Sequence, residues 1–116
     1  MNDEEQRNVC LRNGAEFYPP LKGSRVGIAL HTLDLKPLNG MRIEPEGNTC
    51  GWYLWGGGDP SDADDFFVPM CVEHLVDQCP KALPFLALPP EWRFIADGDY
   101  VDIWYDAALL GGVAKG

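Results

Sequence analysis

The 116-residue sequence predicts an α+β fold, in which two or three helices pack on a mostly antiparallel sheet of about five strands. The predicted elements come in the order helix, three strands, helix, short helix and two strands, which is typical of this class. The length leaves room for one hydrophobic core, and the apolar content of 46% is enough to fill it. We therefore expect a single domain over residues 1–116, in which residues 110–116 form a flexible tail.

The first twelve residues are expected to form a helix. Acids in its first turn favour the positive end of a helix, and Asn13-Gly14 supplies a left-handed stop. Val9 and Cys10 are its expected buried contacts. Pro19-Pro20 then marks an extended connector, because these residues cannot continue a helix.

Three strands are expected in the middle of the chain. Residues 25–33 combine β-branched and apolar residues, which suits a central strand. Asn39-Gly40 is a strong turn signal, and residues 41–44 alternate apolar and polar as a half-buried strand does. Residues 50–55 form the next strand, which ends at the three glycines of 56–58.

The second half of the chain begins with a polar loop over residues 59–65. Residues 70–79 have the apolar spacing of a helix, which a proline ends, and residues 81–88 add a short helix. The runs 92–96 and 100–105 pair across an Asp-Gly-Asp turn, which predicts a β-hairpin.

The charges are unevenly distributed along the chain. Residues 1–58 carry seven acids and six bases, whereas residues 59–106 carry eleven acids and two bases. The second segment therefore has a net charge of −9, which suits a surface that meets a basic partner. The same charge argues against nucleic acid, whose recognition needs a basic face.

Two groups of residues are candidate metal ligands. Cys71-x2-His74-x4-Cys79 places two ligand types on one helix face, but no fourth ligand is nearby, and a cysteine on an apolar stripe usually packs in the core. The loop that starts at Asp59 fails the calcium-loop pattern, which needs glycine at its sixth position and an acid at its twelfth, where Asp64 and Met70 stand. We expect free thiols, no metal and no cofactor.

Clustered carboxylates near the C-terminus are candidates for acid–base catalysis. On a strand over 100–105, alternation sends Asp102, Trp104 and Asp106 to the solvent face. The residues of the other face are expected in the core: Val101, Ile103 and Tyr105. Exposed carboxylates lack the burial that separates an acid from a base, and no nucleophile or phosphate-loop signature is present. We expect no catalytic residues and no enzyme; a carboxylate-dependent hydrolase is the less favoured alternative.

A protein-binding surface is the function that these residues favour. Tryptophans are enriched at interface hot spots, and Trp55 stands beside the glycines and the acidic loop. Trp55 and Trp104 are the expected apolar anchors, and the carboxylates are expected to steer a basic partner. The expected partner-binding residues are Trp55, Asp59, Asp62, Asp64, Asp65, Asp99, Asp102, Trp104 and Asp106.

The sequence has no run of about 18 apolar residues, and its N-terminus is acidic where a secretory signal is basic. We expect a cytoplasmic protein that does not bind membranes. A strand left at a sheet edge could pair two copies, so monomer and homodimer are both open.

Eight motifs carry a resemblance to a known family. They are Val26-Gly27-Ile28-Ala29-Leu30, Asn39-Gly40-Met41-Arg42, Gly51-Trp52-Tyr53-Leu54-Trp55, Asp65-Phe66-Phe67-Val68-Pro69, Val72-Glu73-His74-Leu75, Leu86-Ala87-Leu88-Pro89-Pro90, Arg93-Phe94 and Asp102-Ile103-Trp104-Tyr105-Asp106. In combination, from about Cys10 to Asp106, they resemble a bacterial immunity-protein family. It is the thirty-third family of the polymorphic-toxin classification, formerly a domain of unknown function.

The resemblance implies a protein that binds and neutralises a toxin made by the same or a neighbouring cell, with no catalysis and no cofactor. Members usually have glycine after the double proline, whereas this chain has Glu91. The expected function is therefore to mask a basic functional face of a cognate protein toxin. A general acidic adaptor module with another cellular partner is the main alternative.

Overall fold

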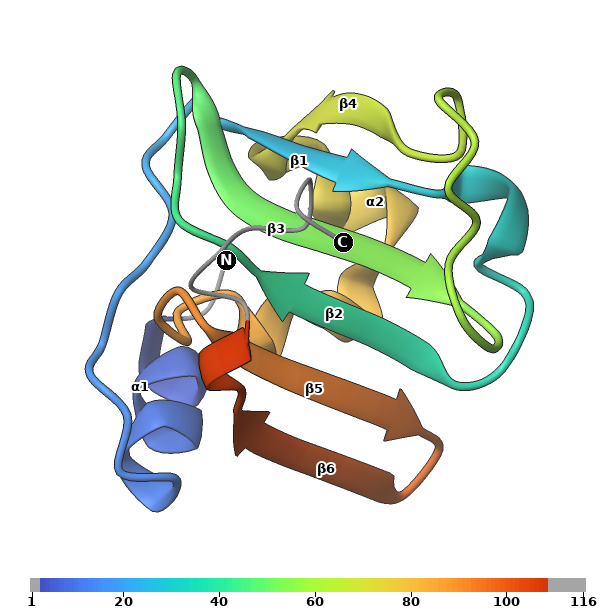
Figure 1. Cartoon of the computed structure of the whole chain (residues 1–116). Coiled ribbons are helices and arrows are strands. Elements are labelled where there is room, and N and C mark those ends of the chain that lie inside the picture. Colours follow the sequence, from blue (N-terminus) through green and yellow to red (C-terminus); the bar gives the residue numbers. More distant parts are fainter. Residues whose placement is uncertain (1–2, 109–116) are drawn as a thin grey trace.

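The structure is a computed structural model, and it describes residues 3–108. Six strands form one sheet in the order β4-β1-β3-β2-β5-β6, in which β1 and β3 are parallel and the other neighbours antiparallel (Figure 1). The strands are β1 (Arg25–Ile28), β2 (Leu38–Arg42), β3 (Thr49–Gly56), β4 (Val68–Cys71), β5 (Trp92–Asp97) and β6 (Tyr100–Tyr105). The prediction of a mostly antiparallel α+β fold is confirmed, with six strands in place of about five.

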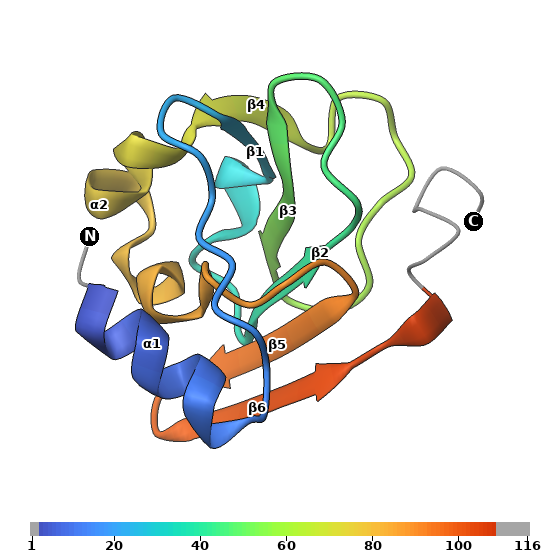
Figure 2. The same ribbon diagram turned by 90° about the vertical axis from the view of Figure 1, so that its left-hand side faces the viewer.

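The helical segments pack mainly on one face of this sheet (Figure 2). They are α1 (Asp3–Arg12), α2 (Leu75–Gln78) and the 3-10 segments η1 (Leu30–Thr32), η2 (Val72–His74) and η3 (Pro80–Phe85). Between this face and the helices lies the main core, which includes Val26, Ile28, Trp52, Leu54, Leu75, Leu86 and Phe94. None of the helices within residues 3–108 has the length and apolarity that a bilayer span requires.

The N-terminal helix is confirmed as α1. Val9 and Cys10 are buried, and Gly14 adopts the left-handed conformation, with φ of +68°. Two side-chain hydrogen bonds join α1 to the segment around η3: Gln6 Nε2 donates to the Leu83 carbonyl at 2.8 Å, and Cys10 Sγ to the Ala87 carbonyl at 3.4 Å. The helix is thus held by its polar as well as its apolar contacts.

The turn predicted at Asn39-Gly40 is wrong, because both residues lie inside β2. Gly40 pairs with Leu54 of β3 on one side and with Phe94 of β5 on the other. A Cβ atom at Gly40 would collide with the Phe94 ring. The glycine therefore provides room for an aromatic ring, and pairing on both sides of the strand overrides its turn propensity.

Three other predicted boundaries are wrong. The strand expected over 41–44 is β2, which begins at Leu38 and ends at Arg42. The strand expected over 25–33 ends at Ile28, and η1 follows almost at once. The helix expected over 70–79 starts at Val72, because its first two residues belong to β4 and pair with β1. Apolar spacing in a short segment does not distinguish a strand from a helix, so the long-range pairing decides the outcome.

The predicted hairpin is confirmed, and its turn at Gly98 has a φ of +60°. The core placement of its second strand is wrong in part: Ile103 packs against the main core, but Val101 and Tyr105 are 48% and 51% exposed. β6 is an edge strand, so within the described residues no further strand covers the side chains of Val101 and Tyr105 on its outer side. The tail predicted over 110–116 lies outside the described residues.

Candidate partner-binding surface

The sheet brings the two acidic segments to one of its ends. In the middle of this end Leu38 of β2 pairs with Gly56 of β3 on one side and with Ala96 of β5 on the other. The loop that follows Gly56 and the β5–β6 turn therefore leave the same end of the sheet (Figure 1), from strands that are about 10 Å apart at two strand spacings. We call this region the acidic end; its exposed carboxylates are Asp59, Asp62, Asp64, Asp65, Asp97 and Asp99.

The β3–β4 loop is fixed where it begins. Asn39 Nδ2 donates to the Gly57 carbonyl at 2.8 Å, and the Gly57 N–H donates to the Pro37 carbonyl at 2.9 Å. The indole N–H of Trp55 donates to the Gly58 carbonyl at 2.7 Å. Three contacts thus set the direction in which the acidic loop leaves the sheet. The role of Asn39 could not be found from the sequence, where the same residue was a turn signal.

The same loop is also fixed where it ends. The rings of Phe66 and Phe67 lie edge to face at 4.8 Å, and Phe67 also meets Tyr53 at 5.0 Å and Trp55 at 6.0 Å. Phe66 meets His31 at 5.2 Å. The loop is therefore held at both ends, and the four aspartates between its anchors stay exposed.

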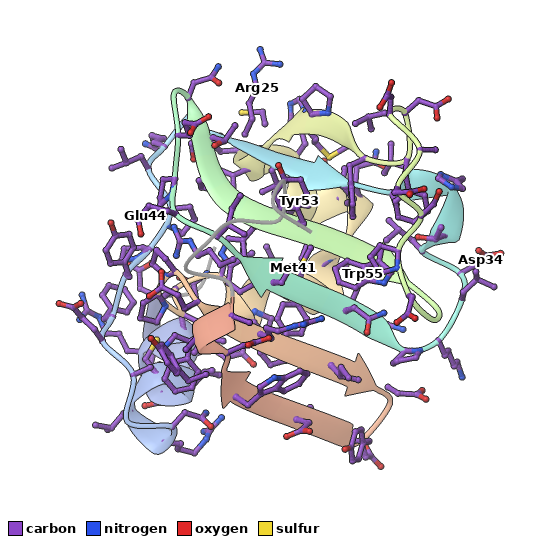
Figure 3. The ribbon with its side chains drawn as sticks, viewed as in Figure 1. Arg25, Asp34, Met41, Glu44, Tyr53 and Trp55 are labelled. Atoms are coloured by element: carbon purple, nitrogen blue, oxygen red, sulfur yellow. The ribbon has the colours of Figure 1, made fainter. Side chains whose placement is uncertain are left out.

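The expectation that Trp55 is an exposed anchor is wrong, because its side chain is 2% exposed. Trp55 belongs to a second apolar cluster, on the face of the sheet opposite the helices, together with Met41 and Tyr53 (Figure 3). Trp52 fills the main core from the other face of the same strand. Both faces of β3 are covered, so neither indole is left for a partner.

Trp104, Asp106 and Asp102 lie along β6 and its end. The guanidinium of Arg93 sits 5.5 Å above the Trp104 ring, and its Nη1 lies 3.2 Å from a carboxylate oxygen of Asp106. Asp106 is therefore partly neutralised, whereas Asp102 is exposed. The two aspartates are four positions apart, about 13 Å along extended chain, so they do not converge as a catalytic pair would.

Of the candidate metal ligands, Cys71 is engaged in another contact. Cys71 Sγ lies 2.8 Å from Glu73 Oε1, and the Gly23 N–H donates to Glu73 Oε2 at 2.9 Å. These hydrogen bonds, that of Cys71 first, lower the pKa of Glu73. Burial raises the pKa of the Cys79 thiol. Within residues 3–108 no group of three His, Cys, Asp or Glu side chains is placed to hold a metal ion. None of the four cysteines in this range forms a disulfide.

Comparison with known proteins agrees with the resemblance noted in the sequence. No curated protein and no solved structure shows a significant match to the chain. A family model described as the Imm33-like domain matches residues 5–106, a range that contains all six strands and the acidic end. The chain therefore belongs to the Imm33-like family.

Proposed function

We propose that the chain is an immunity protein that binds a cognate bacterial toxin and neutralises it, without catalysis, by covering a basic functional face. The family supports the immunity role. The observation that carries the mechanism is the acidic end, where six exposed carboxylates lie on the β3–β4 loop, at the end of β5 and in the β5–β6 turn. None of them forms an ion pair with another described residue, so their charge is free to act on a partner.

The arrangement favours fast recognition of a basic surface. Clustered charges of one sign steer a complementary partner and raise its association rate by a factor of ten to a thousand. Toxins that act on nucleic acids or phosphates need a basic site for their substrate. A rigid acidic end seated on that site would exclude the substrate by charge and by volume.

Apolar contacts beside the acidic end would add affinity. Tyr100 and Val101, which directly follow the acidic turn, are 60% and 48% exposed. Aromatic residues with a free face are frequent interface hot spots. We assign the anchor role to Tyr100, with half-buried Trp104 as a peripheral contact further along β6.

A general acidic adaptor is the second candidate, since its surface would have the same charge. Co-expression with the cognate toxin separates the two. An immunity protein restores growth at stoichiometric levels, whereas an adaptor does not. Failure of the native chain to restore growth would reject the immunity role.

Variants test the mechanism in the same assay. Replacement of Asp62, Asp64 and Asp65 by lysine is expected to abolish the rescue. The matched control replaces three exposed acids outside the acidic end by lysine: Glu44, Glu46 and Asp77. It changes the net charge equally, and we expect it to preserve rescue. Equal rescue by both triple variants would reject the acidic end as the binding surface.

A further inference from the structure

A pocket of about 570 Å³ lies at the end of the sheet away from the acidic end. Because β2 and β3 are antiparallel, Arg42 and Trp52 mark one end of the pair, about 13 Å from Leu38 and Gly56 at the other. The connector between α1 and β1 runs beside the β2–β3 loop here (Figures 1 and 2), and residues of both segments form the walls.

The walls combine apolar side chains with positive charge. Phe17, Tyr18, Leu21 and Pro45 contribute apolar surface. The charged residues of the lining are Arg42 and Lys22, and no aspartate or glutamate of the described chain takes part. The two basic residues distinguish this pocket from the acidic end, although Glu44 and Glu73, outside its lining, act electrostatically on Arg42 and Lys22 respectively.

Arg42 is buried and held by neutral groups. Its side chain is 1% exposed; Nε donates to the Cys50 carbonyl at 2.8 Å, and Nη1 donates to the carbonyls of Tyr18, Leu86 and Leu88 at 2.6, 3.2 and 2.8 Å. Within residues 3–108 no carboxylate forms an ion pair with it. Burial accordingly lowers the pKa of Arg42.

One nitrogen of this guanidinium is uncommitted. Nη2 donates to no described group, whereas Nε and Nη1 have four acceptors between them. Arg42 Nη2 is not among the fully sealed, unpartnered atoms of the described side chains, although Arg42 as a whole is only 1% exposed. Arg42 belongs to the pocket lining, so we take the pocket as the side from which Nη2 can be reached. The rings of Tyr18 and Trp52, 5.0 and 5.7 Å from the guanidinium carbon, further restrict its position.

We infer that this pocket binds a small apolar monocarboxylate, an aromatic or aliphatic acid that accepts hydrogen bonds from Arg42 Nη2. Its apolar body would lie against Phe17, Tyr18 and Leu21. The volume lies within the range of about 300 to 1,000 Å³ typical of small-molecule sites. A single free donor nitrogen and apolar walls suit one carboxylate, and the net charge of −9 repels ligands with several negative charges.

Calorimetry on the full chain with 4-phenylbutyrate and its neutral analogue 4-phenyl-1-butanol tests the inference. The carboxylate is expected to bind at least tenfold more tightly than the alcohol, because a desolvated charge-assisted hydrogen bond is lost with the alcohol. Amide shifts in NMR spectra should concentrate at Tyr18, Thr49 and Cys50. Equal affinities, no binding of either compound, or shifts confined to another region would overturn the inference.

Variants test whether the preference for the carboxylate over the alcohol arises in the pocket. Arg42→Gln is expected to remove the preference for the carboxylate; circular dichroism checks that it folds. Leu21, which is 80% exposed, gives a test that leaves the core intact. Leu21→Asp should bind the carboxylate at least threefold more weakly than Leu21→Asn does, whereas the two variants should bind the alcohol equally. Equal binding of the carboxylate by these two variants would contradict the site. No toxin is needed, so this result is independent of the proposed immunity role.

Discussion

The indole N–H of Trp55 donates to the carbonyl oxygen of Gly58 at 2.7 Å, so a buried tryptophan fixes the start of the acidic loop. Trp55 was expected to contact a partner. It instead positions the loop whose aspartates contact the partner in our proposal. The aromatic strand β3 thereby links the core of the fold to its acidic end.

Trp55→Phe should keep most of the apolar contact but remove this hydrogen bond. We expect a loss of about 1 kcal/mol in the free energy of unfolding and faster hydrogen exchange of amides 57–67. Trp52→Phe is the matched control, because Trp52 Nε1 donates to the Leu86 carbonyl at 2.9 Å in the main core. It should lose similar stability without accelerating exchange in the loop. Identical exchange profiles for the two variants would contradict the role of Trp55.

Gly40→Ala should destabilise the sheet, because the added methyl group meets the Phe94 ring. Overpacking of this kind costs about 1 to 3 kcal/mol. At Gly58 a Cβ atom meets no described atom within 4 Å, so Gly58→Ala should change stability by less than about 0.5 kcal/mol. Urea unfolding compares the two variants. A Gly40→Ala protein as stable as the control would show that the ring moves aside at no cost.

Glu91→Gly should stabilise the protein. Glu91 has a φ of +76°, a left-handed conformation that costs a residue with a side chain about 1 to 2 kcal/mol. Glycine removes this cost, but it also raises the conformational entropy of the unfolded chain, which cancels part of the stabilisation. We expect a net gain of about 0.5 to 1 kcal/mol in thermal or urea unfolding. Glu91→Ala retains the strain and should show no gain. A gain of the same size in Glu91→Ala would trace the effect to the carboxylate instead.

Stability should fall in mildly alkaline solution because of two buried thiols. Burial raises the pKa of both Cys10 and Cys79. Unfolded thiols release their protons from about pH 8.5, whereas the folded ones retain them, so stability is full below that pH and declines as pH rises toward the folded pKa values. The double variant Cys10→Ala, Cys79→Ala should show a smaller decline between pH 8 and pH 10 in urea unfolding under reducing conditions. An equal decline would exclude the thiols as its cause.

The local part of the fold could be predicted from the sequence. α1, the polar loop over 59–65 and the hairpin depend on caps, turn residues and short-range alternation, and all three are present. The placement of Asn39-Gly40 inside β2 and of Met70 and Cys71 in β4 depends on pairing with segments far away in the chain. Local propensity does not depend on such pairing, so it predicted a turn at Asn39-Gly40 and a helix from Met70.

The site could be predicted in the same limited way. The acidity of the loop and of the hairpin is a property of composition, but their meeting at one end depends on β2 lying between β3 and β5. Alternation correctly separates Trp52 from Trp55, yet it does not say whether either face is open. Phe66 and Phe67 cover the second face, and the buried Arg42 has no sequence signal other than a strand position.

The most direct test of the account is the association rate with the cognate toxin at low salt, measured by stopped flow or surface plasmon resonance. Reversal of Asp62, Asp64 and Asp65 to lysine should slow association about tenfold or more, with an unchanged circular dichroism spectrum. Reversal of Glu44, Glu46 and Asp77 should slow it much less, and added salt should reduce the difference. Equal association rates for the two triple variants would show that the acidic end does not guide toxin binding.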